Sequence, residues 1–208
     1  MNLRRLLFSL LILYTLTLLF IEWKFSQDVV RHFFSDIQGV VLHYNVQTPF
    51  YGINTSLSVF CLWSVALLFG VCLLCIDREK DRRAYIFYLS QVFIFAYLGM
   101  DDRLMVHEHL GNLLKVNDTY ILLTVGFIEI GCLIGFGNVC QMPAKARRAL
   151  YTAALLFAVM TVVDAKFPSH LLFRLSAEDL SKLWSDVYLV LFAWEILKYH
   201  LNELKSVK

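Results

Sequence analysis

Charged residues are scarce in this chain. They make up 17% of its 208 residues, whereas 59% are hydrophobic and the mean hydropathy is +0.62. Soluble domains carry roughly 25% charged and 45–50% apolar residues. The formal net charge is only +2, and no stripe of Lys and Arg with interleaved aromatic residues is present. The composition therefore predicts an integral membrane protein and argues against a nucleic-acid partner.

Linkers, repeats and outward-facing cysteines are also lacking. The absence of linkers predicts a single domain over residues 1–208, and the absence of repeats gives no support to a transporter built on internal repeats. All five cysteines lie inside apolar segments, which predicts no disulfide framework. Cys72 and Cys75 form a single CxxC pair, for which packing is a better explanation than metal or redox chemistry.

Apolar segments account for most of the chain. A helix needs about 20 mostly apolar residues to cross the hydrocarbon core, because backbone polar groups cannot be left unpaired in lipid. The first segment follows Arg4 and Arg5, but it is long and has no small-residue cleavage site after it, so we expect it to be retained. We expect an all-α membrane bundle of six transmembrane helices, near 6–23, 53–76, 85–110, 120–140, 150–165 and 183–200.

The distribution of Lys and Arg predicts the orientation. Of the 19 basic residues, 12 fall on one side of these six spans and 7 on the other, and the dense clusters are all in the larger group. Basic residues in short loops mark the cytoplasmic side. We therefore expect cytoplasmic termini in a plasma (cytoplasmic) membrane, with five of the six histidines outside and only His200 inside. Segment 25–52 predicts an amphipathic element at the outer interface.

The sequence LGMDDRLMVHEHLGN, residues 98–112, crowds acids and histidines at the outer end of the third span. Gly111 and Asn112 resemble a helix C-cap, which predicts one continuous helix over 85–110, about 39 Å long. Its acids and histidines would then pair at i and i+7, about 10.5 Å apart, too far for one metal. A closed metal site would need acids from other helices. The candidate ligands are Asp101, Asp102, His107, Glu108, His109 and Asp186, with Asp164 and Glu129 as further acids.

Four residues of this stretch resemble the signature of a known group of proteins. Asp101 and Asp102, four residues, then His107 and Glu108 resemble an acidic-pair, x4, His-Glu signature of small, largely uncharacterised multi-pass membrane proteins of bacteria. Such proteins typically have Asp-Glu where this chain has Asp-Asp. The resemblance implies that these four residues are the signature positions.

Glu129 is an ionisable residue deep within the fourth span. Such a group is a functional-site hypothesis by default, because placing it in lipid costs at least about 2.5 kcal/mol. It could also be protonated and hydrogen-bonded to Gln91 or to a tyrosine. On the opposite side of the same helix, Gly131 and Gly135 form a GxxxG motif that predicts close helix packing.

Several functional hypotheses follow and stay open. Residues 101–109 fit a solvated helix end, or part of a Zn, Mn or Fe site that hydrolyses a lipid or lipid-linked substrate. Glu129 and Gln91 fit a proton-coupled transport component. The non-catalytic alternative is an accessory or assembly subunit of a membrane complex, with 25–52 as its docking surface for a protein partner or a second copy.

Overall fold

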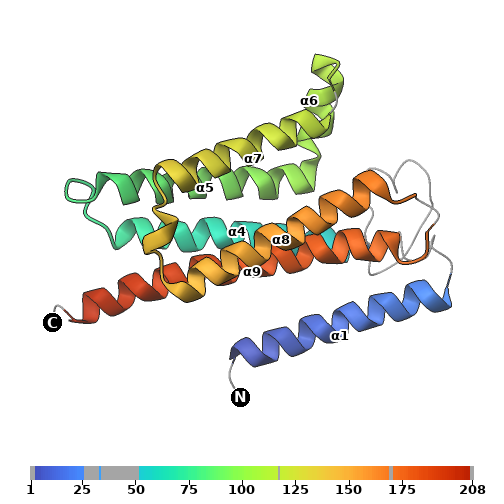
Figure 1. Cartoon of the computed structure of the whole chain (residues 1–208), viewed down its shortest axis with the longest axis horizontal. Helices are drawn as coiled ribbons and strands as arrows, with labels where there is room; N and C mark the ends of the chain where they lie inside the picture. Colours follow the sequence, from blue (N-terminus) through green and yellow to red (C-terminus); the bar gives the residue numbers. More distant parts are fainter. Residues whose placement is uncertain (1–2, 26–32, 34–51, 117, 169–170, 207–208) are drawn as a thin grey trace. The chain divides into compact units, whose positions relative to one another are not determined.

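The computed structural model describes residues 3–25, 33, 52–116, 118–168 and 171–206. Within these residues every regular element is a helix, which confirms the all-α class (Figure 1). In chain order the helices are α1 (Leu3–Lys24), α4 (Ile53–Leu74), α5 (Arg82–Leu104), α6 (Val106–Leu114), α7 (Asp118–Gly135), the 3-10 helix η1 (Val139–Gln141), α8 (Ala144–Lys166) and α9 (Arg174–Ser206).

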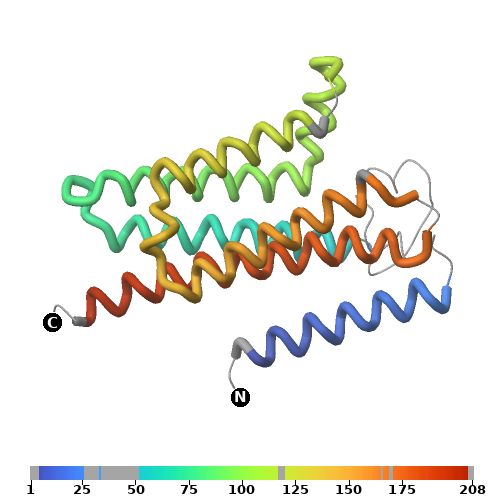
Figure 2. Tube along the Cα trace, viewed as in Figure 1, coloured from blue at the N-terminus to red at the C-terminus, as the bar shows by residue number. Residues whose placement is uncertain are grey.

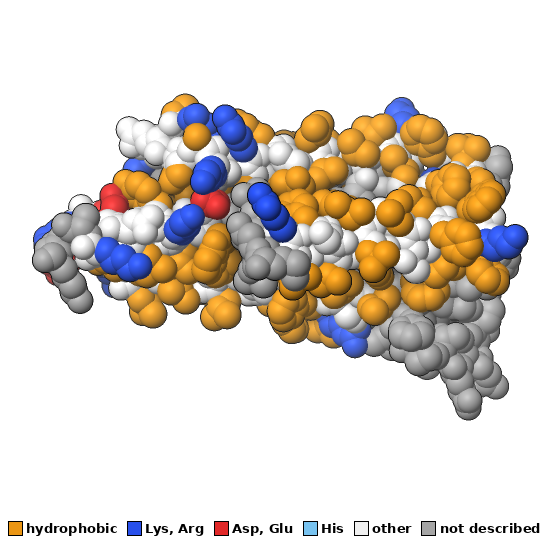
Figure 3. All heavy atoms as spheres, turned by 90° about the horizontal axis from the view of Figure 1, so that it is seen from below, with side chains coloured by type: hydrophobic (Ala, Val, Ile, Leu, Met, Phe, Trp, Pro, Cys, Tyr) orange, Lys and Arg blue, Asp and Glu red, His pale blue; other side chains and the backbone are white. Residues whose placement is uncertain are grey.

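Four of the described helices are long and apolar enough to cross a membrane. These segments are Arg5–Lys24, Ile53–Leu74, Arg82–Leu104 and Ala144–Asp164, and α7 contributes a shorter apolar segment, Tyr120–Gly135. Large apolar side chains lie on the outside; Leu74, Leu113 and Ile134 are each more than 70% exposed. Figure 3 shows hydrophobic side chains over much of the surface in view, with single Lys and Arg side chains scattered among them. Such a surface is compatible with lipid rather than water as the surrounding solvent.

The chain divides into two compact units, which are described separately. Unit 1 comprises Met1–Ser56 and Leu155–Trp184, and unit 2 comprises Leu57–Ala154 and Ser185–Lys208. The boundaries fall within α4, α8 and α9 and not in linkers. In unit 1, Leu18 of α1 and Leu180 of α9 are buried together, and Trp184 Nε1 donates a hydrogen bond of 3.0 Å to Thr15 Oγ1.

Unit 2 holds the larger apolar core. Phe69 of α4 lies at its centre and contacts the rings of Phe87, Tyr88, Phe95 and Phe192 at centroid distances of 5.6–6.4 Å. Ring pairs at these separations contribute about 0.5–1.5 kcal/mol each beyond area burial. The chain trace runs along α5, turns through α6 and returns along α7, so that α5 and α7 are antiparallel neighbours (Figure 2).

Three expectations from the sequence need correction. The continuous helix over 85–110 is wrong, because α5 ends at Leu104 and α6 begins at Val106. The helix expected over 120–140 ends at Gly135. The close packing predicted at Gly131 and Gly135 is also absent, since a Cβ added at either would meet no atom of the described residues within 4 Å. Almost all of the predicted amphipathic segment 25–52 lies outside the described residues.

Candidate functional site

The break between α5 and α6 brings Asp101 against His107. Asp101 lies in the last turn of α5 and is 3% exposed. Its Oδ1 accepts a hydrogen bond of 2.7 Å from the His107 backbone N–H, and its Oδ2 lies 2.8 Å from His107 Nδ1. Both oxygens of one carboxylate therefore contact a single histidine. When Asp101 is ionised it can only accept, so a neutral His107 carries its proton on Nδ1 and keeps the lone pair on Nε2.

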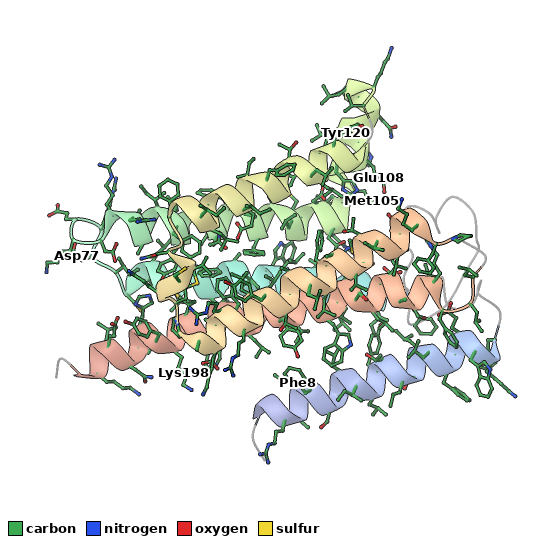
Figure 4. All side chains as sticks on the ribbon, viewed as in Figure 1. Phe8, Asp77, Met105, Glu108, Tyr120 and Lys198 are labelled. Atoms are coloured by element: carbon green, nitrogen blue, oxygen red, sulfur yellow. The ribbon has the colours of Figure 1, made fainter. Side chains whose placement is uncertain are left out.

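Met105 makes this arrangement possible. It adopts the left-handed conformation, with φ 51° and ψ 45°, and its N–H donates to the Asp101 carbonyl at 2.7 Å to close α5. A non-glycine residue in this conformation costs roughly 1–2 kcal/mol. Met105 provides no side-chain cap for α6, so Asp101 acts in place of an N-cap residue. In Figure 4, Met105 lies at the junction of the two helices and Glu108 in α6.

The remaining candidate ligands do not join this pair. Glu108 and His109 are exposed, and His109 Nδ1 lies 2.8 Å from the Met105 carbonyl. Asp102 is half-buried beside Asp101. Among the described residues, no group of three or more His, Cys, Asp or Glu side chains could hold a metal ion. The pair alone thus falls short of the three protein ligands that a catalytic zinc site uses.

Asp186 contacts a residue that sequence analysis did not single out. Ser58 of α4 donates a hydrogen bond of 2.6 Å to Asp186 Oδ2, and both residues are at least 95% buried. Next to it, Ser185 Oγ donates to the Ala153 carbonyl at 2.9 Å. The available signal was a group of polar residues near the start of this span, because a buried carboxylate requires a donor on a neighbouring helix.

Glu129 lies against Gln91, as one of the two sequence interpretations predicted. Gln91 Nε2 donates a hydrogen bond of 2.8 Å to Glu129 Oε2, which joins α5 to α7. Gln91 is completely buried, whereas its neighbour on α5, Phe93, is 67% exposed. On α7, Phe127 and Ile128 are likewise exposed at 69% and 53%. The carboxyl therefore points into unit 2 from a helix whose other faces are apolar and open.

Comparison with known proteins places the chain in a family. A model described as a domain of unknown function (DUF8692) matches residues 6–196. The chain belongs to this family. The region matched by the DUF8692 model includes the Asp101–His107, Gln91–Glu129 and Ser58–Asp186 pairs. No curated protein and no solved structure matches the chain.

Proposed function

We propose that this DUF8692 protein spans the plasma membrane several times and takes part in proton-coupled transport, with Glu129 as the group that binds the proton. The observation that carries the proposal is the hydrogen bond of 2.8 Å between Gln91 and Glu129. Glu129 is the only charged residue from Tyr120 to Gly135. Ionisable residues are expensive inside a membrane, and where they occur they mark ion or proton pathways.

Six spans fit the helices of the chain. Besides the four apolar helices named above, α7 has 18 residues. At 1.5 Å per residue it is about 27 Å long, close to the roughly 30 Å hydrocarbon core. The long α9 contains the sixth expected span, 183–200. With cytoplasmic termini, the loop that holds Asp77 lies inside and the α5–α6 junction lies outside; Figure 4 shows Asp77 and Met105 at opposite ends of unit 2.

Gln91 suits both protonation states of Glu129, because an amide has a donor and an acceptor. Its Nε2 donates to the carboxyl in the structure. Its Oε1 is buried and accepts no hydrogen bond from the described residues, so it is available to the O–H of a protonated Glu129.

Proton flux into liposomes tests the proposal. The purified protein is reconstituted with an enclosed pH-sensitive dye, and flux is driven by an imposed potassium potential. We expect Glu129→Gln to abolish the flux, because an amide does not bind a proton in this pH range. Glu79→Gln makes the same chemical change in an exposed turn and should retain wild-type flux. Full flux in Glu129→Gln, or no flux in the wild type, contradicts the proposal.

A metal-dependent hydrolase is the second candidate, and one observation favours it. A carboxylate that fixes the tautomer of a histidine, as Asp101 does for His107, is the usual outer partner of a metal-bound imidazole. In that role Asp101 orients the ligand, and His107 Nε2 would bind Zn, Mn or Fe. Metal analysis of detergent-purified protein after metal-replete growth tests this, with His107→Ala as the control. A metal content equal in wild type and variant contradicts a site at His107.

A further inference from the structure

A second polar cluster lies at the other end of α5, where Tyr88 meets the C-terminal part of α9. The Tyr88 hydroxyl oxygen is 2.8 Å from His200 Nε2, and His200 Nδ1 is 3.5 Å from Glu203 Oε2. One imidazole therefore contacts a phenol through one nitrogen and a carboxylate through the other. Figure 4 labels Asp77 and Lys198 toward this end of unit 2, away from Glu108. His200 is the one histidine that the sequence predicts on the inner side, whereas no signal in the sequence singles out Tyr88.

The three groups run from the interior of unit 2 to its surface. Tyr88 is 7% exposed, whereas the side chains of His200 and Glu203 are 15% and 55% exposed. A hydroxyl, an imidazole and a carboxylate in this order connect a buried position to water through groups that can each give and accept a proton.

Aromatic packing fixes the geometry of this cluster. The Phe69 ring stacks on Tyr88 at a centroid distance of 5.7 Å, and the His200 ring meets Tyr88 at 5.5 Å with an interplanar angle of 81°. Because the Phe69 ring holds the Tyr88 ring, the phenol is positioned against His200 without the ordering of a free side chain. The Tyr88–His200 contact is therefore preorganised for repeated proton transfer.

The cluster is close to the proposed proton-binding pair along α5. Tyr88 and Gln91 are three residues apart, so they lie on the same face, one helical turn and about 4.5 Å of rise from each other. Gln91, the partner of Glu129, therefore lies one turn of α5 away from the buried end of the cluster. The other titratable groups that act on Tyr88 and His200 are Cys72 of α4, Asp81 before α5 and Tyr199 of α9.

We propose that Tyr88, His200 and Glu203 form a proton relay that connects the interior of unit 2, one turn of α5 from Gln91, to the cytoplasm, an inference that rests on the proposed function. A proton that arrives at the Tyr88 oxygen displaces the proton already there, which moves to His200 Nε2. His200 releases its Nδ1 proton to the Glu203 carboxylate, which then gives it to water. One proton enters and one leaves, Tyr88 is unchanged, and the imidazole exchanges one neutral tautomer for the other and rotates back. His200 and Glu203 follow residues 6–196, so the relay is inferred for this chain and not for the family.

The test uses the liposome assay with three variants of the full chain. Tyr88→Phe keeps the ring that packs on Phe69 and removes only the hydroxyl. His200→Ala opens a space that free imidazole can enter. We expect each to lower the flux at least about tenfold, since a positioned acid–base group contributes on the order of 10²–10⁴. Imidazole in the buffer should restore His200→Ala, which a purely structural role would not allow. Tyr151→Phe, at a 58% exposed position on α8, should leave the flux unchanged.

Failure of the relay differs from failure of the proposed function. Wild-type flux in Tyr88→Phe and His200→Ala, with Glu129→Gln inactive, overturns the relay alone. Full flux in Glu129→Gln overturns the proposed function. A second readout, independent of flux, is the ¹⁵N NMR spectrum of histidine-labelled protein in lipid. The relay requires neutral His200 to carry its proton on Nδ1 in the wild type and to lose this preference in Tyr88→Phe. A proton on Nε2 in the wild type contradicts the relay.

Discussion

Removing the Asp101 carboxylate should destabilise the junction of α5 and α6. Asp101→Ala deletes the acceptor of the His107 N–H and the partner of Nδ1, at distances of 2.7 and 2.8 Å. A hydrogen bond to a charged group contributes about 1.5–3 kcal/mol, and loss of a cap costs about 0.5–2 kcal/mol. These terms overlap, because one contact is itself the cap. We therefore expect the free energy of unfolding to fall by about 2–4 kcal/mol.

Asp101→Asn separates the two contacts. Its oxygen can still accept from the His107 N–H, but its amide nitrogen can face Nδ1 only if the ring adopts its other tautomer. A neutral acceptor forms hydrogen bonds about half as strong as a charged one, so the loss should be roughly half that of Asp101→Ala. Met105→Gly provides the complementary change, since glycine adopts the left-handed conformation without strain. It should be neutral or slightly stabilising.

Thermal unfolding in detergent, followed by the fraction that stays monodisperse, measures these effects. For a chain of 150–250 residues each kcal/mol shifts the midpoint by about 2–4 °C, so Asp101→Ala should melt at least about 4 °C below the wild type. Glu108→Gln, an exposed acid on the same helix, is the matched control and should leave the midpoint unchanged. A midpoint for Asp101→Ala equal to that of the wild type, or a loss in Asp101→Asn as large as that in Asp101→Ala, contradicts the stabilising role of the Asp101 carboxylate.

Three further changes test other parts of the structure. Gly99→Ala should destabilise unit 2 by about 1–3 kcal/mol, because the new methyl would overlap the Trp63 indole, and Trp63→Phe should restore part of the loss in the same melting assay. Ser58→Ala should cost about 1–3 kcal/mol by removing a donor from the buried Asp186, whereas Ser58→Thr should be milder. Burial raises the pKa of the Glu178 carboxyl above 4.5, and the nearby Asp164 carboxylate raises it further. The folded state therefore binds the Glu178 proton more tightly than the unfolded state does. This contribution to the free energy of unfolding is complete below pH 4.5 and is lost as the pH rises through the raised pKa. In melts across pH, Glu178→Gln should reduce this decline, and a parallel curve for the variant would refute it.

The sequence predicts the positions of most helices because a long run of apolar residues in such a chain is expected to form a helix, in which the backbone polar groups are paired. It does not predict the break at Met105. Gly111 and Asn112 carry the usual signal for a helix end, whereas Met105 carries none. The left-handed conformation there depends on an interaction across the break, the cap that Asp101 provides to His107. A local pattern cannot show this, because the stabilising side chain belongs to the preceding helix.

One rule predicted part of the candidate site: a polar residue within an apolar span needs a hydrogen-bond partner. That rule joined Glu129 to Gln91, and the structure confirms the contact. It did not identify Ser58 or Tyr88, because serine and tyrosine are common in spans without any polar role. Whether a serine or tyrosine has a polar partner depends on which helix faces pack together, and a single sequence does not give this packing.

Three of the polar pairs share one helix, and this has a consequence for transport. Tyr88, Gln91 and Asp101 all project from α5, with partners on α9, α7 and α6. Tyr88 and Gln91 are one turn apart, but ten residues, about 15 Å of helix, separate Gln91 from Asp101. The buried residues in that interval include Ile94 and Phe95, which offer no proton acceptor. Tyr97, which is half-buried, is the one side chain with a hydroxyl in that interval. Under the proposed function Glu129 is therefore separated from the outer end by a longer and mostly apolar stretch than the single turn of α5 that separates Gln91 from Tyr88. Exchange of protons with the outer side then requires a second conformation in which this interval opens and the Tyr88 end closes.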